Sequence, residues 1–285
     1  MKNIINQNHD DAIISIYTMP EFNILASIFD RIDFLAKYFL GKPYITNPQG
    51  EGAQAEFDSA PLYRFDGFDC VTYVNNILAL ALSHDLQSFQ KNLLKINYYH
   101  SIPKYENRFH FMSVDWNPQN QKNKILRDIT TAICDEKNKS IATFAEGDID
   151  RPNWFLKKSE NETHERAAYL QHAAATVKKE FIRLPYLPLN KLFDHQKNPC
   201  EFLFHQIPHG CIIEIVRPNW NLSEKIGTNL HVSHVGFAIR KPSGELLFRH
   251  ASSEQKCVTE VLLSDYLKNA LENPTIKGIN VQIIM

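Results

Sequence analysis

Cys70 is the residue whose position best suits nucleophilic chemistry. It follows Asp69 and the turn Asp66-Gly67, and it begins an apolar segment with a helical pattern that runs to about Ser83. If Asp69 caps this helix, the free amides and the positive end of the helix dipole stabilise a thiolate at Cys70. A thiolate is the form that attacks a carbonyl. The alternative is a cysteine that only packs in the core.

A second chemical feature is His234 in the segment 231–240, HVSHVGFAIR. The segment alternates as a strand does, with large apolar residues on one face. The other face carries His234, Gly236 and Ala238. The small residues predict room for a helix on that face, so that His234 reaches a thiol on the helix. The alternative is a structural histidine with satisfied hydrogen bonds.

Turn chemistry connects a third residue, His250, to this strand. The sequence Pro242-Ser243-Gly244 suits a three-residue hairpin loop with glycine in the left-handed position. In that register His250 faces Gly236 and lies diagonally next to His234. A loop one residue longer or shorter would place the two histidines on opposite faces. The sequence thus predicts a nucleophile, a base and a group that orients the base.

The cysteine and histidine spacing argues against metal chemistry. The five cysteines form no CxxC pair, which is typical neither of a structural zinc site nor of a disulfide scaffold. His164-Glu165 and His172 invite a zinc hypothesis, but the two histidines are eight residues apart, about 80° round a helix. We therefore expect free thiols and neither a metal nor another cofactor.

Composition excludes several partner classes. The chain has 285 residues, 44% hydrophobic and 22% charged, with a formal net charge of −1. The sequence has no basic stripe of the kind that would predict nucleic-acid binding. No window approaches the ~18 apolar residues of a membrane span, and the first residues lack the apolar run of a secretory signal.

The periodicity predicts an α+β fold in a single domain, 1–285. Residues 1–40 form a helical extension, residues 85–180 a mostly helical insertion and residues 205–285 a sheet half. Helices are predicted at 21–40, 70–83, 85–97, 119–134 and 160–180, and residues 41–66 and 135–153 read as loops. Antiparallel strands are predicted at 211–216, 231–240, 245–251, 257–262 and 279–284.

Five segments occur in the order FDCVTYV at 68–74, RFHFMSVDW at 108–116, LPYLPL at 184–189, SHVGFAI at 233–239 and HASS at 250–253. Together they resemble the N-acetylmuramoyl-L-alanine amidase-like family within the NlpC-type papain-like superfamily. The resemblance runs from about Leu40 to Leu267. It implies a papain-like fold with a nucleophile helix packed on the sheet, Cys70 as nucleophile, His234 as base and His250 as the residue that holds the imidazole.

The resemblance also implies residues that line the substrate cleft: Arg108, His110, Asp115, Trp116 and Tyr186. Such a set offers aromatic faces, a cation for carboxylates and acceptors for amides. The alternative for Arg108 and Asp115 is an internal salt bridge.

The implied function is hydrolysis of the amide between N-acetylmuramic acid and L-alanine in peptidoglycan or muropeptides. A stem-peptide endopeptidase with the same residues and a non-catalytic wall-binding module are the alternatives. The family usually has a glutamate where this chain has Asn75, and often Gly-Asp where it has Gly210-Cys211, which leaves the substrate open. By analogy such an enzyme works in the periplasm or cell envelope; a cytoplasmic wall-recycling role fits the unpaired thiols.

Overall fold

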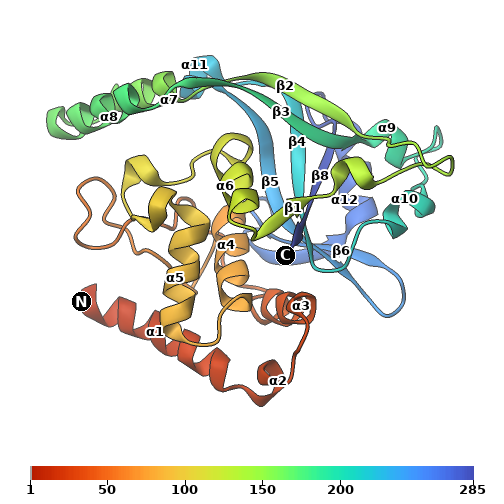
Figure 1. Cartoon of the computed structure of the whole chain (residues 1–285), viewed down its shortest axis with the longest axis horizontal. Helices are drawn as coiled ribbons and strands as arrows, with labels where there is room; N and C mark the ends of the chain where they lie inside the picture. Colours follow the sequence, from red (N-terminus) through yellow and green to blue (C-terminus); the bar gives the residue numbers. More distant parts are fainter. Residues whose placement is uncertain (1) are drawn as a thin grey trace.

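An eight-stranded antiparallel sheet forms the centre of the computed structural model (Figure 1). The structure describes residues 2–285, and the side chains of residues 9–218 and 220–285. The strand order is β2-β3-β8-β4-β5-β6-β7, and β1 pairs with β8. The strands are β1 Leu126–Asp128, β2 Thr143–Asp150, β3 Lys179–Pro188, β4 Cys211–Asn221, β5 Asn229–Arg240, β6 Leu246–Ser252, β7 Cys257–Leu262 and β8 Gly278–Ile284.

Twelve α-helices surround this sheet in the described residues. They are α1 Lys2–Thr18, α2 Pro20–Asn23, α3 Ile28–Tyr38, α4 Cys70–Ala81, α5 Leu86–Asn97, α6 Asn117–Lys122, α7 Arg151–Ser159, α8 His164–Thr176, α9 Leu189–Leu192, α10 Glu201–His205, α11 Ser223–Ile226 and α12 Leu263–Ala270. A π-helical turn at Met112–Trp116 leads into α6. The fold is therefore α+β with a large antiparallel sheet, as predicted.

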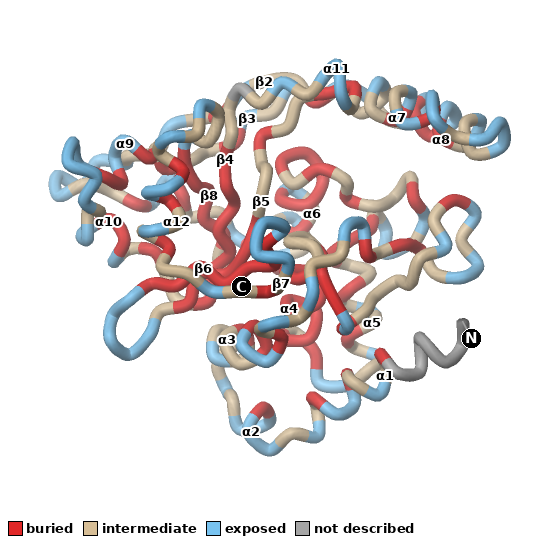
Figure 2. The backbone as a smooth tube through the Cα atoms, turned by 180° about the vertical axis from the view of Figure 1, so that it is seen from behind, coloured by how far each residue is buried: buried red, intermediate tan, exposed pale blue. Residues whose placement is uncertain are grey.

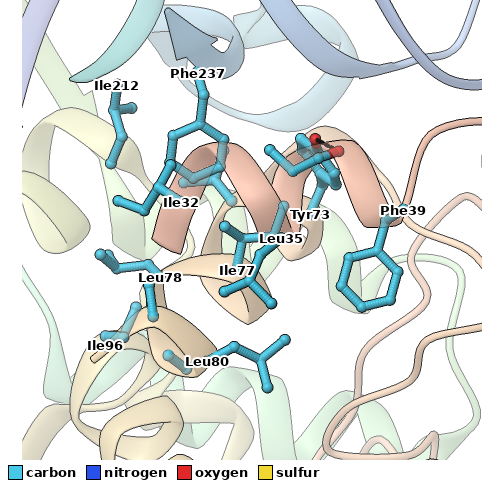
Figure 3. Packing of buried hydrophobic residues seen from close by; sticks show 14 of the residues in the cluster. Ile32, Leu35, Phe39, Tyr73, Ile77, Leu78, Leu80, Ile96, Ile212 and Phe237 are labelled. Carbon is cyan, nitrogen blue, oxygen red and sulfur yellow. Dashed lines mark hydrogen bonds between the residues drawn. The ribbon is translucent and has the colours of Figure 1, made fainter. Parts of the chain in front are cut away.

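The apolar helix α4 is the centre of the larger core. Asp69 caps it by accepting a hydrogen bond from the Thr72 amide at 2.8 Å, and the Thr72 hydroxyl accepts one from the Asp69 amide at 3.0 Å. This capping box fixes where the helix begins. Figure 3 shows Tyr73 of α4 beside Phe237 of β5 and the apolar residues of α3 around them. Each such buried side chain contributes about 1.5–3 kcal/mol.

The other face of the sheet carries a second core under α9, α10 and α12. Figure 2 shows buried backbone along β4, β6 and β8 between the two layers. The prediction that the small-residue face of β5 receives the nucleophile helix is wrong. α4 packs on the face that carries Val235 and Phe237, where large side chains offer it more apolar area, and Ala238 faces the second core.

Three predicted boundaries also need correction. The single helix at 21–40 is two helices, because Ser27 interrupts it and caps α3 by accepting from the Phe29 amide at 3.2 Å. The helix at 119–134 ends at Lys122, and β1 follows it because its residues pair with β8. The loop at 135–153 contains strand β2, whose pairing with β3 from Thr143 to Asp150 outweighs its polar composition.

The sheet consequently extends beyond the predicted C-terminal half. Within residues 85–180 the chain is helical over α5, α6, α7 and α8, but β1, β2 and the start of β3 also lie there. The strands predicted after residue 205 are confirmed as β4–β8. The helices predicted to start at residues 70 and 85 are confirmed as α4 and α5, each with an aspartate cap.

Candidate active site

Cys70, a half-buried residue, lies in the first position of α4, where its sulfur meets several backbone amides. Burial raises the pKa of the Cys70 thiol to about 12, and the neighbouring Asp69 carboxylate adds to the rise. The amides of Val235, Val71 and Cys70 itself act in the opposite direction. These donors surround the sulfur with partial positive charge, which favours a negative charge when one develops.

The amide of Val235 places the sulfur beside strand β5. The β5–β6 ladder runs from Arg240↔Leu246 to Phe237↔Arg249, and Val235 lies beyond its last pair. Its amide interacts with Cys70 instead of with a neighbouring strand residue of β6. Since His234 directly precedes Val235, the start of α4 lies next to the backbone that carries this histidine.

His234 and His250 are in direct contact. The hairpin register is as predicted: Gly244 has φ +93°, and the ladder pairs Phe237 with Arg249, which places His250 opposite Gly236 one residue beyond the last pair. His234 Nε2 lies 2.6 Å from His250 Nδ1. Gly236 makes this contact possible, because a Cβ at that position would lie 2.8 Å from the Cβ of His250.

Both imidazoles are neutral at physiological pH. Burial, together with the charge of His250, lowers the pKa of His234 to about 3, and burial lowers the pKa of His250 to about 4. One nitrogen of the 2.6 Å contact must donate and the other accept. If His234 Nε2 donates, His234 Nδ1 is an acceptor that can take a proton from a thiol. The resting pair is then a neutral thiol and a neutral base.

Two tyrosines that sequence reasoning missed belong to this neighbourhood. The Tyr266 ring centroid lies 5.4 Å from that of His250 and 6.2 Å from that of His234. Burial and, as a smaller contribution, the charge of a thiolate at Cys70 raise the pKa of Tyr44 and of Tyr266 to about 12. The available signal was their position, because they lie near the two ends of the segment that carries the family resemblance.

Asp115 and Trp116 do not line a cleft, contrary to the expectation. Both are buried, at 2% and 1% exposure. Asp115 accepts hydrogen bonds from Tyr99 Oη at 2.7 Å and Arg151 Nη1 at 2.9 Å. Trp116 Nε1 donates to Asn75 Oδ1 at 2.9 Å, which gives Asn75 a structural role. The polar side-chain atoms of Asp115 and Trp116 are therefore hydrogen-bonded to other residues inside the protein.

Arg108 and His110 are also engaged by protein partners. Arg108 forms salt bridges with Glu51 and with Asp58, the latter at 3.0 Å. The internal salt bridge predicted as an alternative exists for both Arg108 and Asp115, but with different partners. His110 Nε2 contacts the Tyr105 carbonyl at 2.7 Å, and burial holds the pKa of His110 well below its usual value.

Tyr186 lies apart from the histidine pair. It is on β3, and two strands, β8 and β4, separate β3 from β5. It lines a pocket of about 510 Å³ with residues of β3, α9 and α12's C-terminal extension. This pocket and a larger one beside His250 share the lining residue Ile276.

The described residues bring together no group of three histidine, cysteine or carboxylate side chains suited to a metal ion. His164, Glu165 and His172, which suggested zinc, lie on α8. In the same part of the chain, no helix is long and apolar enough to cross a membrane.

Comparisons with known proteins identify the family to which the chain belongs. The model of the AmiA-like family, described as N-acetylmuramoyl-L-alanine amidase-like, matches residues 34–276. A crystal structure of a Legionella pneumophila protein from a family of domains of unknown function has 41% identity and a TM-score of 0.94, covering 100% of this chain and 97% of that one. No curated protein matches significantly.

Two more distant structures share the fold. An N-acetylmuramoyl-L-alanine amidase from Bacteroides uniformis has 24% identity and a TM-score of 0.63, with 90% of this chain and 98% of that chain covered. A Bacteroides fragilis protein described as a candidate xylanase has 25% identity and a TM-score of 0.62, with 88% and 99% covered.

Proposed function

Because the chain belongs to the N-acetylmuramoyl-L-alanine amidase-like family, we propose that it is a cysteine hydrolase that cleaves the amide between N-acetylmuramic acid and L-alanine. Cys70 is the nucleophile, His234 the general base and His250 the residue that orients the base. The observation that carries this proposal is the 2.6 Å contact between His234 Nε2 and His250 Nδ1, next to a sulfur held at the Val235 amide.

The chemistry follows from the protonation states. His234 Nδ1 accepts the thiol proton as the Cys70 sulfur attacks the amide carbon. His250 Nδ1 accepts a hydrogen bond from the remaining His234 N–H and so stabilises the imidazolium that forms. His234 then returns the proton to the leaving amine, which departs as the C–N bond breaks. Water attacks the thioester, His234 accepts the water proton, and the thiol is regenerated with release of the acid.

The start of α4 supplies the groups that stabilise negative charge. The amides of Cys70 and Val71 are among those that a helix leaves unpaired in its first turn. An oxyanion formed at the attacked carbonyl would be held there by the same N–H groups and by the helix dipole. The raised pKa of the Cys70 thiol favours loss of its proton to His234 only as the sulfur attacks, rather than beforehand.

We place the fold in the NlpC-type papain-like superfamily. The support is topological: the nucleophile begins a helix packed on an antiparallel sheet, and the base and its partner come from the adjacent strands β5 and β6. Glycoside hydrolysis, which the name of the Bacteroides fragilis protein suggests, needs two carboxyl groups facing the bond. The carboxylate next to Cys70 is that of Asp69, and it already accepts hydrogen bonds from the amide and the hydroxyl of Thr72.

Digestion of muropeptides tests the proposal. Wild type should release free stem peptide that begins with L-alanine, identified by mass spectrometry, and Cys70→Ala should release none. Cys134→Ala is the matched control, because it removes another partly exposed free thiol and should leave activity unchanged. Cleavage inside the stem would move the substrate to the endopeptidase alternative, and activity in Cys70→Ala would refute the cysteine mechanism.

A further inference from the structure

Glu214 and Asn117 are two buried residues that the catalytic steps derived above do not use. Glu214 lies on β4 and is fully buried, and Asn117, the first residue of α6, is 3% exposed. Asn117 Nδ2 donates a hydrogen bond to Glu214 Oε2 at 3.0 Å. The other oxygen of each side chain, Glu214 Oε1 and Asn117 Oδ1, has no hydrogen-bond partner among the described residues. Two side chains that share one hydrogen bond therefore each keep a buried acceptor without a donor.

A proton on Glu214 Oε1 supplies the missing donor. A protonated carboxyl and a primary amide form a ring of two hydrogen bonds, in which the amide N–H donates to the acid and the acid O–H donates to the amide oxygen. The first of these bonds is present, and the second uses the two oxygens that lack partners. A carboxylate has no donor and would leave both oxygens unsatisfied in the protein interior. The neutral acid is therefore the form that satisfies both side chains.

The surroundings of Glu214 also favour the neutral acid. The residue opposite it on β8 is Asn280, and the residue opposite it on β5 is Val235. The charged group that acts on it is Asp128 of β1, whose carboxylate accepts hydrogen bonds from Asn280 and Gln282. Burial, with a smaller effect from Asp128, raises the pKa of Glu214 to about 8. Glu214 consequently stays neutral in the folded protein up to a mildly alkaline pH.

Glu214 is next to the backbone amide that meets the nucleophile. It lies directly opposite Val235, whose amide contacts the Cys70 sulfur. The side chains of opposite residues lie on the same face of a sheet, with about 4.5–5.5 Å between their Cβ atoms. The regular pairing of β4 with β5 ends one residue further on, at Ile215, where the register shifts. This part of β5 therefore has less support from the ladder and depends more on side chains that anchor β4.

Asn117 connects the same strand to the helix that carries the nucleophile. It directly follows Trp116, whose Nε1 donates to Asn75 Oδ1 of α4 at 2.9 Å. Figure 1 shows α6 beside α4 and the sheet. One bond of this segment thus reaches α4, and the next residue reaches Glu214 on β4. The pair joins the element that carries the sulfur to the strand that supports the Val235 amide.

We propose that Glu214, as a neutral acid in a hydrogen-bonded ring with Asn117, is a positioning residue that holds the Val235 amide against the Cys70 sulfur. When Glu214 ionises, the O–H that bonds to Asn117 is lost and the link between β4 and α6 weakens. The site then loses an amide that stabilises negative charge at the sulfur, while the contact between the two histidines is unchanged. The catalytic consequence rests on the proposed amidase function.

The pH dependence of kcat per folded molecule tests this role. The pKa values of Cys70, His234 and His250, about 12, 3 and 4, leave the range around pH 8 to Glu214. Wild-type kcat should be about tenfold lower at pH 9 than at pH 7, with KM unchanged, because the neutral fraction of Glu214 falls by that factor. Glu214→Gln keeps both hydrogen bonds of the ring, since its amide donates and accepts, and should keep its kcat to pH 9. An equal fall of kcat in both proteins overturns the proposal.

Linkage separates positioning from a purely structural role. The raised pKa of Glu214 removes stability between about pH 4.5 and about pH 8, and the loss is nearly complete above that range. Positioning is lost only when the folded protein itself ionises, so kcat should fall where the free energy of unfolding has become nearly constant. A kcat that follows stability below pH 8 contradicts the proposal. The control Leu203→Ala, in the second core, should lower stability and leave the alkaline fall of kcat in place.

Asn117→Ala tests the other half of the ring. The variant removes the amide, so kcat should be several-fold lower already at pH 7. In this background kcat should no longer depend on whether residue 214 is glutamate or glutamine, because the two substitutions act on one ring and are not additive. If Glu214→Gln still protects kcat at pH 9 when Asn117 is absent, the ring is overturned.

Hydrogen exchange at Val235 separates the proposal from the amidase function, because it needs no substrate. The protection factor of the Val235 amide, measured by NMR, should fall in wild type above pH 8 by more than that of amides in the second core, and should not do so in Glu214→Gln. This result without cleavage of muropeptides supports the positioning role and contradicts the amidase. Cleavage with equal Val235 protection in both proteins supports the amidase and overturns the positioning role.

Discussion

Glu214 provides a quantitative test of the protonation state of a buried acid on β4, the strand that pairs with β5 below the active site. It lies on β4 opposite Val235, the residue whose amide meets Cys70, and it is fully buried. Its Oε2 accepts a hydrogen bond from Asn117 Nδ2 at 3.0 Å, and its Oε1 has no partner. Burial, with a smaller contribution from Asp128, raises the pKa of Glu214 from 4.5 to about 8.

The free-energy consequence follows from linkage. A raised folded-state pKa means that the folded protein keeps the neutral form, so the contribution of Glu214 is complete below pH 4.5 and is lost as the pH rises to about 8. At about 1.36 kcal/mol per pKa unit, the loss is about 5 kcal/mol. That is a large part of the roughly 5–15 kcal/mol that stabilises a typical domain.

Glu214→Gln isolates this effect, because glutamine resembles the protonated acid and does not titrate. We expect its free energy of unfolding, measured by denaturant titration, to rise relative to wild type by about 5 kcal/mol between pH 4 and pH 9. Both proteins should have similar activity per folded molecule at pH 6. Parallel curves for the two proteins across this range would refute the assignment of Glu214 as a buried neutral acid.

Three further predictions concern the site itself. Iodoacetamide should alkylate Cys70 slowly at neutral pH, with a rate that rises about tenfold per pH unit from pH 6 to 9, because burial raises the thiol pKa to about 12; a rate independent of pH would instead indicate a preformed thiolate. Gly236→Ala should lower kcat at least tenfold and cost about 1–3 kcal/mol in unfolding experiments, because its Cβ would collide with His250; wild-type kcat would contradict the close approach. Trp116→Phe should lower stability by about 1–3 kcal/mol by leaving the buried Asn75 Oδ1 without its donor, with KM unchanged, whereas a raised KM in a stably folded variant would restore the substrate-lining role.

The parts of the site that could be predicted from the sequence depend on short-range rules. The cap at Asp69 fixes the start of α4 because it involves only residues 69–72. The register that brings His234 to His250 follows from a three-residue loop and a strand period of two. Both rules act within about twenty residues, so the sequence contains the information needed.

The parts that could not be predicted depend on contacts between distant segments. Asp115 forms its salt bridge with Arg151, and Arg108 its salt bridge with Glu51, only after β2, β3 and the loop at 41–66 have been brought together. Strand β2 is too polar to show a core-facing pattern, and its pairing with β3 comes from the sheet. Alternation showed which face of β5 carries the larger apolar residues, but both faces are covered by a core, so the face that receives α4 depends on how distant segments pack.

The most direct test of the central claim is to trap the acyl-enzyme. Wild type mixed with a muropeptide and quenched in acid should carry, by intact-protein mass spectrometry, the mass of the muramoyl group on Cys70. Peptide mapping should locate the adduct at that residue, and Cys70→Ser should carry no thioester. Turnover of the muropeptide by Cys70→Ala, or an adduct on any other residue, would contradict the account.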